Sequence, residues 1–213
     1  MQKTFLSTLV FVLLLGQLTQ AQNKPLSNRV NLLFGLNQPL LGGFNIEGNL
    51  FYKRLVFDYS HGVSLNFSNA TLAGDEKTQQ LAVHIPYTTG FGVGYRFNEW
   101  FNLRAEPKWH RFELYYEGDA QTIDNRIVAY NTFSLGIGAY FNVRPFKNKE
   151  GFLKGIMIAP SIRYWPKLSD NLANNFTYQN RVTGQSESLS AMEVGVSNTP
   201  WIFNISIGYT FEY

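Results

Sequence analysis

Hydrophobic and polar residues alternate one by one along much of the chain, and the last segment shows the pattern best. From Trp201 to Tyr213 every odd position carries an aromatic residue or Ile. The even positions hold Asn, Ser, Gly, Thr and Glu, with Ile202 as the exception. Successive side chains of a β-strand point to opposite faces, so this alternation predicts a strand with one apolar and one polar face.

Seven earlier segments repeat the pattern and bring the expected number of strands to eight. They cover residues 29–37, 43–51, 54–65, 81–97, 100–116, 126–142 and 152–165. In segment 100–116 the apolar positions change phase at Phe112, which predicts a bulge near the far end of that strand. No segment after the first 21 residues has a helical repeat, so the sequence predicts an all-β fold.

The connections between these segments alternate mostly between short and long. They cover residues 38–42, 52–53, 66–80, 98–99, 117–125, 143–151 and 166–199. Short turns on one rim and long loops on the other are typical of an antiparallel up-and-down barrel in an outer membrane. An even number of strands places both chain ends at the rim with the short turns, which we expect to face the periplasm.

The two faces of the strands differ in bulk, and this decides which face lines the barrel. The apolar faces carry many large rings, among them Phe91, Trp109 and Phe203, whereas the polar faces carry Gly92 and Gly136. The interior of an eight-stranded barrel is just wide enough to be filled by side chains. The rings must therefore point outward. An outward belt of rings predicts a transmembrane barrel rather than a soluble barrel of the lipocalin type.

Composition narrows the class further. Aromatic residues make up 16% of the 213 residues and charged residues only 15%, which excludes a disordered chain. The absence of cysteine excludes a disulfide scaffold and a Cys-ligated metal site. A net charge of +3 without a basic stripe predicts no nucleic-acid partner.

The first residues have the order of a secretory signal peptide. Lys3 precedes an apolar stretch from Phe5 to Leu15, and Thr19 and Ala21 supply the small residues of a cleavage site. The apolar stretch is too short to span a membrane as a helix. We therefore expect residues 1–21 to be a cleaved signal peptide and residues 22–213 to form one outer-membrane barrel domain.

The end of the chain carries a resemblance to a known class. The run Ile205, Ile207, Tyr209, Phe211 and Tyr213 resembles the terminal strand of Gram-negative outer-membrane proteins. With the signal peptide and the eight strands, the chain resembles the small barrels of the OmpA-transmembrane and OmpX type. The resemblance implies an outer-membrane location, contact with outer-membrane lipid, and recognition of Ile207, Tyr209, Phe211 and Tyr213 by the barrel assembly machinery. We expect no peptidoglycan-binding domain of the kind found in full OmpA.

Charged residues on the polar faces should meet inside the barrel. This expected lumen network consists of Glu47, Asp58, Arg96, Arg104, Glu106, Lys108 and Arg163. Isolated buried charges are very costly, so these groups must pair or be hydrated. The favoured interpretation is a salt-bridged plug, with Glu106 as one of the compensating acids; a charge-lined conduction path is the alternative. Glu212, at the short-turn mouth, is expected to be solvated.

Enzymatic constellations are sparse. His61 is flanked by Ser60 and lies near Asp58, but alternation puts His61 on the lipid face and the other two on the opposite face. The outer-membrane lipid A deacylases have His and Ser two residues apart on one face, and this chain does not match that pattern. We expect no catalytic, cofactor-binding or metal site.

Three function classes remain from the sequence alone. The favoured one is a non-catalytic surface barrel with a plugged lumen, whose loops bind a partner or support envelope integrity. The alternatives are a lipid-modifying enzyme and, third, a small-solute channel. The polar and aromatic loop at 166–199 is the candidate region for an extracellular ligand.

Overall fold

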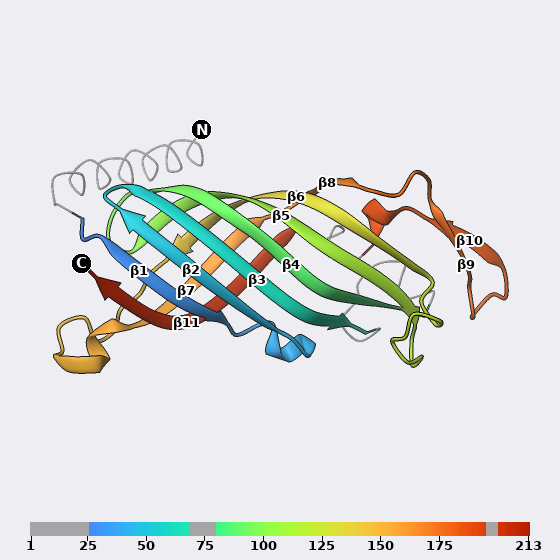
Figure 1. Cartoon of the computed structure of the whole chain (residues 1–213), viewed down its shortest axis with the longest axis horizontal. Helices are drawn as coiled ribbons and strands as arrows, with labels where there is room; N and C mark the ends of the chain where they lie inside the picture. The colour runs from blue at the N-terminus through green and yellow to red at the C-terminus, as the bar shows by residue number, and fades with distance from the viewer. Residues whose placement is uncertain (1–25, 69–79, 195–199) are drawn as a thin grey trace, which may run out of the picture.

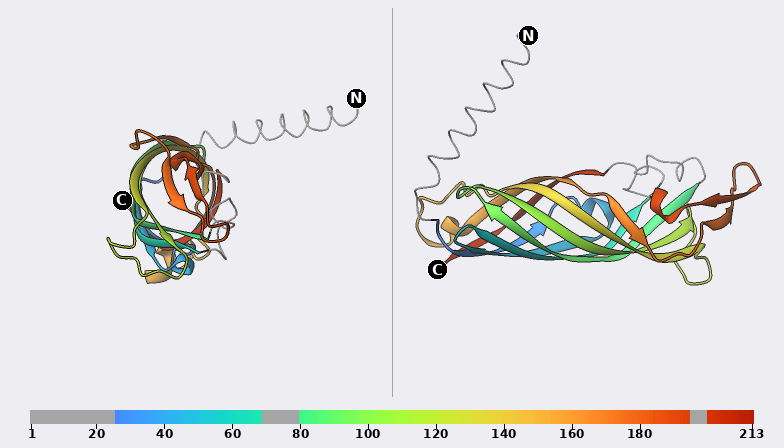
Figure 2. Two further views of the ribbon diagram at one scale, coloured as in Figure 1. Left: turned by 90° about the vertical axis from the view of Figure 1, so that its right-hand side faces the viewer. Right: turned by 90° about the horizontal axis from the view of Figure 1, so that it is seen from above.

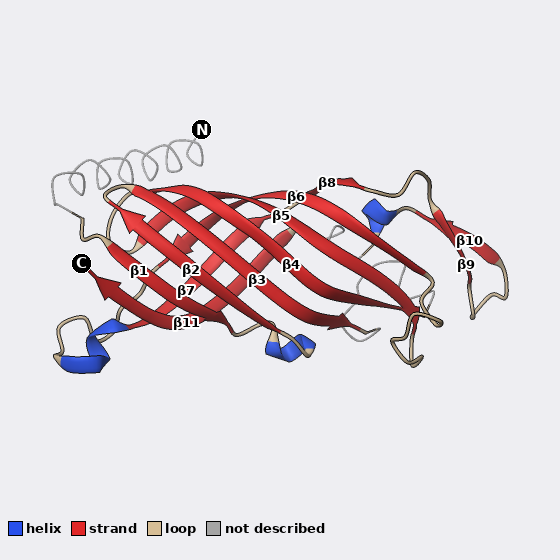
Figure 3. Cartoon of the chain, viewed as in Figure 1, coloured by secondary structure: helices blue, strands red, loops and turns tan. Residues whose placement is uncertain are grey.

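A closed barrel of eight antiparallel strands dominates the computed structural model, which describes residues 26–68, 80–194 and 200–213 (Figures 1 and 3). The expected signal peptide lies outside these ranges. None of the helices in the described residues is long and apolar enough to span a membrane. The barrel strands are β1 (Arg29–Gly35), β2 (Phe44–Tyr52), β3 (Leu55–Phe67), β4 (Leu81–Arg96), β5 (Phe101–Tyr116), β6 (Val128–Phe141), β7 (Ile156–Tyr164) and β11 (Trp201–Glu212).

The last strand closes the barrel. β11 pairs with β1 on one side, with Ile207 opposite Phe34, and with β7 on the other, with Ile205 opposite Pro160. The remaining strands pair in chain order, and β5 pairs with both β4 and β6. The predicted up-and-down topology is therefore confirmed. Each of these eight strands has a neighbour on both sides, which a strand in lipid requires.

The two rims also match the expectation. The connection at Lys53 joins β2 to β3 in a tight turn, and Lys53 adopts a left-handed φ of 51° there. This turn, the connection between β4 and β5, the start of β1 and the end of β11 lie at the left of Figure 1. We call this end the short-turn rim. The opposite end, where the connection between β5 and β6 and the long segment between β7 and β11 lie, is the long-loop rim.

The predicted bulge is present in another strand. β5 keeps one phase throughout and pairs without interruption with β6, from Phe101 to Leu114. The register shift lies between His84 and Thr88 of β4, opposite the far end of β5. Phe112 and Leu114 therefore point inward, on the same face as Arg104 and Lys108. The alternation does not change phase there; the inward residues change from polar to apolar.

The segment expected to be a loop at 166–199 contains further structure. It forms β8 (Lys167–Asp170), which pairs with β6, and a separate hairpin of β9 (Phe176–Gln179) and β10 (Ser186–Leu189). A short 3-10 turn, η4 (Ala191–Glu193), follows; η2 (Pro39–Leu41) and η3 (Gly151–Gly155) lie in other connections. Strands of four residues are too short for alternation to reveal them. Figure 2 shows the hairpin beyond the barrel strands at the long-loop end.

The outside of the barrel is apolar, as predicted. Phe203 is 67% exposed and Trp109 is 42% exposed, whereas Arg104 and Ser134 on the inner face are each 2% exposed. A belt of exposed rings and aliphatic side chains around a closed barrel is the surface that a bilayer covers. The orientation of the two faces confirms the transmembrane type of barrel.

The wall of the barrel is uneven in height. β1 and β2 have 7 and 9 residues, whereas β4 and β5 have 16 each. The taller strands continue toward the long-loop rim as a curved sheet with an apolar concave face. Residues 171–194 pack against this face, and the resulting core includes Leu65, Leu81, Val83, Ile85, Phe112, Leu114, Tyr130, Phe176, Tyr178, Leu189, Ala191 and Val194.

Candidate functional site in the barrel lumen

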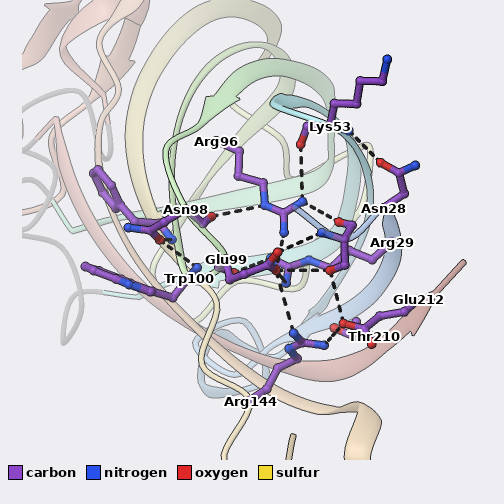
Figure 4. Close-up of polar contacts among 12 residues, drawn as sticks. Asn28, Arg29, Lys53, Arg96, Asn98, Glu99, Trp100, Arg144, Thr210 and Glu212 are labelled. Carbon is purple, nitrogen blue, oxygen red and sulfur yellow. Dashed lines mark hydrogen bonds and ion pairs between the residues drawn. The ribbon is translucent and has the colours of Figure 1, made fainter. Parts of the chain in front are cut away.

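The short-turn mouth of the lumen is filled by two arginines and a phenylalanine. Arg29 and Arg96 are both fully buried, and their guanidinium carbons lie 4.5 Å and 5.2 Å from the centre of the Phe51 ring. Glu99, in the turn between β4 and β5, pairs with both arginines (Figure 4). A planar guanidinium stacks well on an aromatic face, and here two of them close the mouth around one ring.

The same rim holds two charged residues that the sequence singled out, Arg96 and Glu212, and it changes the expectation for Arg96. Arg96 was expected to join the lumen network, yet its acidic partner is Glu99 at the rim. Glu212, which was expected to be solvated, is an exposed residue; it also pairs with Arg144 (Figure 4) and lies 3.7 Å from Lys154. Sequence reasoning missed Arg29 and Glu99. The alternation along β1 indicated that Arg29 points inward, because it lies two residues from the inward Asn31 and so on the same face. Glu99 lies in a turn, where no such alternation exists.

Midway along the lumen, Arg104 is held between two acids from other strands. Its Nη1 lies 2.7 Å from Glu47 Oε1 and 3.4 Å from Asp58 Oδ2. Arg163 approaches Glu47 from β7 at 3.9 Å. All four side chains are at least nine-tenths buried. Glu47 thus takes the central place, because it meets cations from two strands, β5 and β7, neither of which pairs with its own strand β2.

Aromatic and amide groups complete this layer. The ring of Tyr140 lies 4.1 Å from the Arg104 guanidinium carbon and 5.0 Å from that of Arg163. Asn102 accepts a hydrogen bond from Arg104 Nε, and Asn49 donates one to Glu47. The guanidinium of Arg104 is therefore surrounded by acceptors and by a ring, as a buried charge requires.

Inward glycines make room for these side chains. A Cβ on Gly92 would lie 2.1 Å from Asp58 Oδ2, and one on Gly136 would lie 2.9 Å from Trp165 Cδ1. Both distances are shorter than real Cβ contacts. The small residues predicted to line the lumen therefore face larger side chains: Asp58 of the neighbouring strand β3, and Trp165 in the connection between β7 and β8.

Glu106 differs from its expected role. It is buried on the inner face of β5, but no cation lies within 4 Å of its carboxylate among the residues described. The acids that contact Arg104 are Glu47 and Asp58. Lys108, two residues farther toward the long-loop rim, also has no carboxylate within 4 Å in that part of the chain, and its Nζ lies 4.2 Å from the centre of the Trp165 ring.

A cavity of about 350 Å³ lies on the long-loop side of this network. Lys108, His110, Ser134 and Arg163 line its polar part, and Leu65, Ile85 and Phe112 line its apolar part. The cavity therefore sits where the polar lumen changes into the apolar outer half of the barrel. The alternation of inward and outward positions along the strands predicted that these strand residues point inward, but it did not reveal the space between them.

The histidines do not form a catalytic constellation with an acid. His61 of β3 pairs opposite Ile46 of β2 and Thr89 of β4. Ile46 is exposed on the outer face, so His61 lies on the lipid-facing side of the sheet, as predicted. His110 in the lumen contacts Thr88 Oγ1 through Nδ1 and Ser134 Oγ through Nε2, both at 2.8 Å. These hydroxyls satisfy the ring, and no acidic third member contacts it in the described ranges. Those ranges contain no group of three or more His, Cys, Asp or Glu residues that could hold a metal ion.

The predicted assembly residues lie on the closing strand. Ile207, Tyr209 and Phe211 pair opposite Phe34, Leu32 and Val30 of β1. Tyr213 donates its backbone N–H to the carbonyl of Asn28 at 3.2 Å. Ile207, Phe211 and Tyr213 are exposed on the outside of the barrel. Their contribution to the fold is therefore the seam between the first and last strands.

The sequence matches no family model, and a search of curated proteins finds no match. Solved structures do match. Ail, the attachment invasion locus protein of Yersinia pestis, in complex with the heparin analogue sucrose octasulfate, has 12% identity and a TM-score of 0.40, covering 87% of this chain and 99% of that one. A major outer membrane protein from Thermus thermophilus has 9% identity and a TM-score of 0.42, covering 88% and 99%. The N-terminal β-barrel domain of Pseudomonas aeruginosa OprF has 11% identity and a TM-score of 0.37, covering 88% and 100%.

Proposed function

We propose that this chain is a non-catalytic outer-membrane barrel with a closed lumen, whose exposed loops bind a partner or support envelope integrity. The apolar exterior supports the membrane location, because outer-membrane lipid would cover it. The signal-peptide pattern in residues 1–21 supports export. The C-terminal strand supports assembly by the barrel assembly machinery, since this strand forms the closing seam.

The main observation in support of a closed lumen is that buried side chains fill it at two levels along the barrel. Arg29, Arg96 and Phe51 fill the short-turn mouth, and Arg104 with its two acids fills the middle. An eight-stranded barrel leaves little room beyond its own side chains. A permeating ion would have to displace ion pairs at both levels. Breaking those pairs adds a free-energy cost to the cost of removing the ion from water.

The packing of side chains at the long-loop end favours a binding surface there over the open mouth of a pore. Phe112 stacks on Tyr130 at 5.5 Å, and Tyr130 stacks on Phe176 of the hairpin at 6.4 Å. The described part of this segment, residues 166–194, thus packs over the apolar inner face at this end of the barrel and presents the tip of the hairpin outward. An extracellular ligand of this segment is part of the proposal, and the hairpin tip is where it would bind.

Planar-bilayer recording tests closure. The purified barrel should give no steady unitary current, while a large porin in the same bilayer supplies the positive control. The double variant Arg29→Ser with Arg96→Ser removes the rim layer only, and it should remain closed because the Arg104 layer persists. Steady, ion-selective current through the wild type would overturn the proposed closed lumen and favour the channel.

A further inference from the structure

The cavity beside the Arg104 network has an unbalanced charge. Among the described residues that line it, Lys108, Arg163 and Lys167 are cationic and none is acidic. The acids Glu47, Asp58 and Glu106 lie outside this lining. This lining of cations without acids distinguishes the cavity from the Arg104 layer, where Glu47 and Asp58 contact Arg104.

The three cations are neutralised to different degrees. Arg163 shares Glu47 with Arg104, at 3.9 Å. Lys167 Nζ donates hydrogen bonds to the backbone carbonyls of Ala191 and Val194, at 3.1 Å and 2.5 Å, which hold it at the long-loop side of the cavity. Lys108 is only 4% exposed and lies over the Trp165 ring, with no described carboxylate within 4 Å. A buried ammonium in this state favours an anion as its partner.

The other walls of the cavity are apolar. Leu41, Leu65, Phe67, Ile85 and Phe112 line it on the side of the long-loop rim. A ligand that fits both parts therefore needs an anionic end against Lys108 and an apolar body against these side chains. Ligand pockets usually span about 300–1,000 Å³, so this cavity suits a small ligand.

The lining also reaches the outside of the barrel. Trp201 and Phe203 of β11 contribute to it, although both are exposed on the apolar outer face. Trp201 stands opposite Tyr164 in the last pair of β11 with β7, and the chain then leaves β7 to pair with β6 as β8. The cavity therefore extends to the wall at the point where this pairing ends, beside the lipid-facing rings.

We propose that this cavity binds an anionic amphiphile of fatty-acid type, with its carboxylate against Lys108 and its hydrocarbon chain along the apolar walls. The site does not depend on the proposed closure of the lumen, because a barrel that conducts could still hold such a ligand. Two sources share this chemistry: a long-chain fatty acid dissolved in the membrane, and a shorter one from the surrounding water.

Binding of carboxyl-labelled decanoate to the full barrel in zwitterionic nanodiscs tests the proposal. NMR should show one saturable bound carboxylate signal that empty nanodiscs lack. Decanol and decyltrimethylammonium should not displace it, because neither offers an anion. Competition by oleate alone would identify the membrane as the source, and competition by octanoate would identify the aqueous phase.

Matched variants separate the site from the surface. Lys108→Met should weaken decanoate binding at least about tenfold, whereas Lys108→Arg should restore it. Lys154→Met, which removes an exposed lysine near the short-turn rim, should bind like the wild type. Leu41→Trp lies outside the strands and should exclude decanoate by filling the cavity, so it tests the site even if Lys108→Met does not fold. Equal affinity of the wild type and both variants, Lys108→Met and Leu41→Trp, or displacement by decanol, would overturn the proposal.

Discussion

Small and large residues alternate across the lumen, and this pairing lets a narrow barrel hold several charges. Gly92 faces the Asp58 carboxylate and Gly136 faces the Trp165 ring, in both cases closer than a methyl group would allow. Because neither glycine carries a Cβ, the Asp58 carboxylate of β3 and the Trp165 ring from the connection between β7 and β8 can occupy that space in the lumen. The ion pairs are therefore a consequence of strand register as much as of charge.

The central position of Glu47 leads to the first prediction. Glu47→Gln removes the acid that meets both Arg104 and Arg163 and leaves buried positive charge uncompensated. Breaking such a pair typically costs about 3–5 kcal/mol, so the free energy of unfolding should fall by that order. Denaturant titration of the barrel in detergent measures the change.

Two matched substitutions frame this result. Glu150→Gln changes an exposed acid in the connection between β6 and β7 and should leave stability unchanged. Glu106→Gln should cost less than Glu47→Gln, because no described cation lies within 4 Å of Glu106. If Glu106→Gln proved the more damaging, the assignment of Glu47 as the central acid would be wrong.

The alternation along the strands predicted which charged residues point into the lumen, but not which of them form ion pairs with each other. Glu47, Asp58, Arg104, Glu106, Lys108 and Arg163 are all buried on inner faces, as alternation indicated. Their pairing depends on the distance across the barrel between β2 and β5, which are not neighbours in the sheet. Sequence alone contains no measure of that distance, which is why Glu106 was expected to act where Glu47 and Asp58 do.

At the scale of elements, long strands were predictable and short ones were not. Each of the eight barrel strands lies within a few residues of its predicted segment, because seven or more alternating positions give a clear pattern. β8, β9 and β10 have four residues each and were missed. The apolar inner face beyond Phe112 could not be predicted either, because an apolar lumen reverses the usual rule that polar side chains point inward in a membrane barrel.

The closing strand supports a prediction about assembly. Deleting Phe211–Tyr213 removes the pairing of Phe211 with Val30 and the backbone bond from Tyr213 to Asn28. The start of β1 would then present unpaired backbone groups to lipid, which is costly. We expect misassembled or degraded protein, measured as the loss of folded barrel in outer-membrane fractions. Normal surface levels of the truncated chain would contradict this role for the strand end.

The loop contact between Asp119 and Arg181 predicts a pH dependence. Arg181 donates to both Asp119 oxygens, at 2.8 Å and 3.1 Å, and its hydrogen bonds hold the pKa of Asp119 below the ordinary value of 3.8. A carboxyl with a lowered pKa contributes stability above its unfolded pKa and loses it as the pH falls through the folded one. The contact should therefore persist at neutral pH and separate only below pH 3.8.

The NMR shift of the Arg181 guanidinium should follow this titration. At neutral pH, Asp119→Asn should make the chain easier to cleave by trypsin after Arg181, because the hairpin tip loses its ionic contact with the connection between β5 and β6. Asp124→Asn, at an exposed acid in the same connection, serves as the comparison. An unchanged cleavage rate in Asp119→Asn would show that the ion pair does not restrain the hairpin.

At the scale of the whole molecule, three features of the sequence determine the class of fold: strict alternation, large rings on one face and small residues on the other. A soluble barrel of the same strand number would need the rings inside, where this lumen has no room for them. The structure places the rings outside and closes the sheet through β11, so the class of fold and the order of its eight barrel strands could be predicted. The filling of the long-loop half by the hairpin could not, because it depends on packing between segments far apart in sequence.

The closed barrel predicts how the whole protein behaves during purification. A sheet without unpaired edges in its membrane region unfolds only when all its strand pairs separate, so it should stay folded in cold sodium dodecyl sulfate. Unheated samples should therefore migrate differently from boiled ones on a gel. The exposed belt that includes Phe203 and Trp201 should also make detergent necessary for extraction from membranes. Recovery of the protein in a soluble periplasmic fraction without detergent, with the same migration before and after boiling, would contradict the membrane barrel.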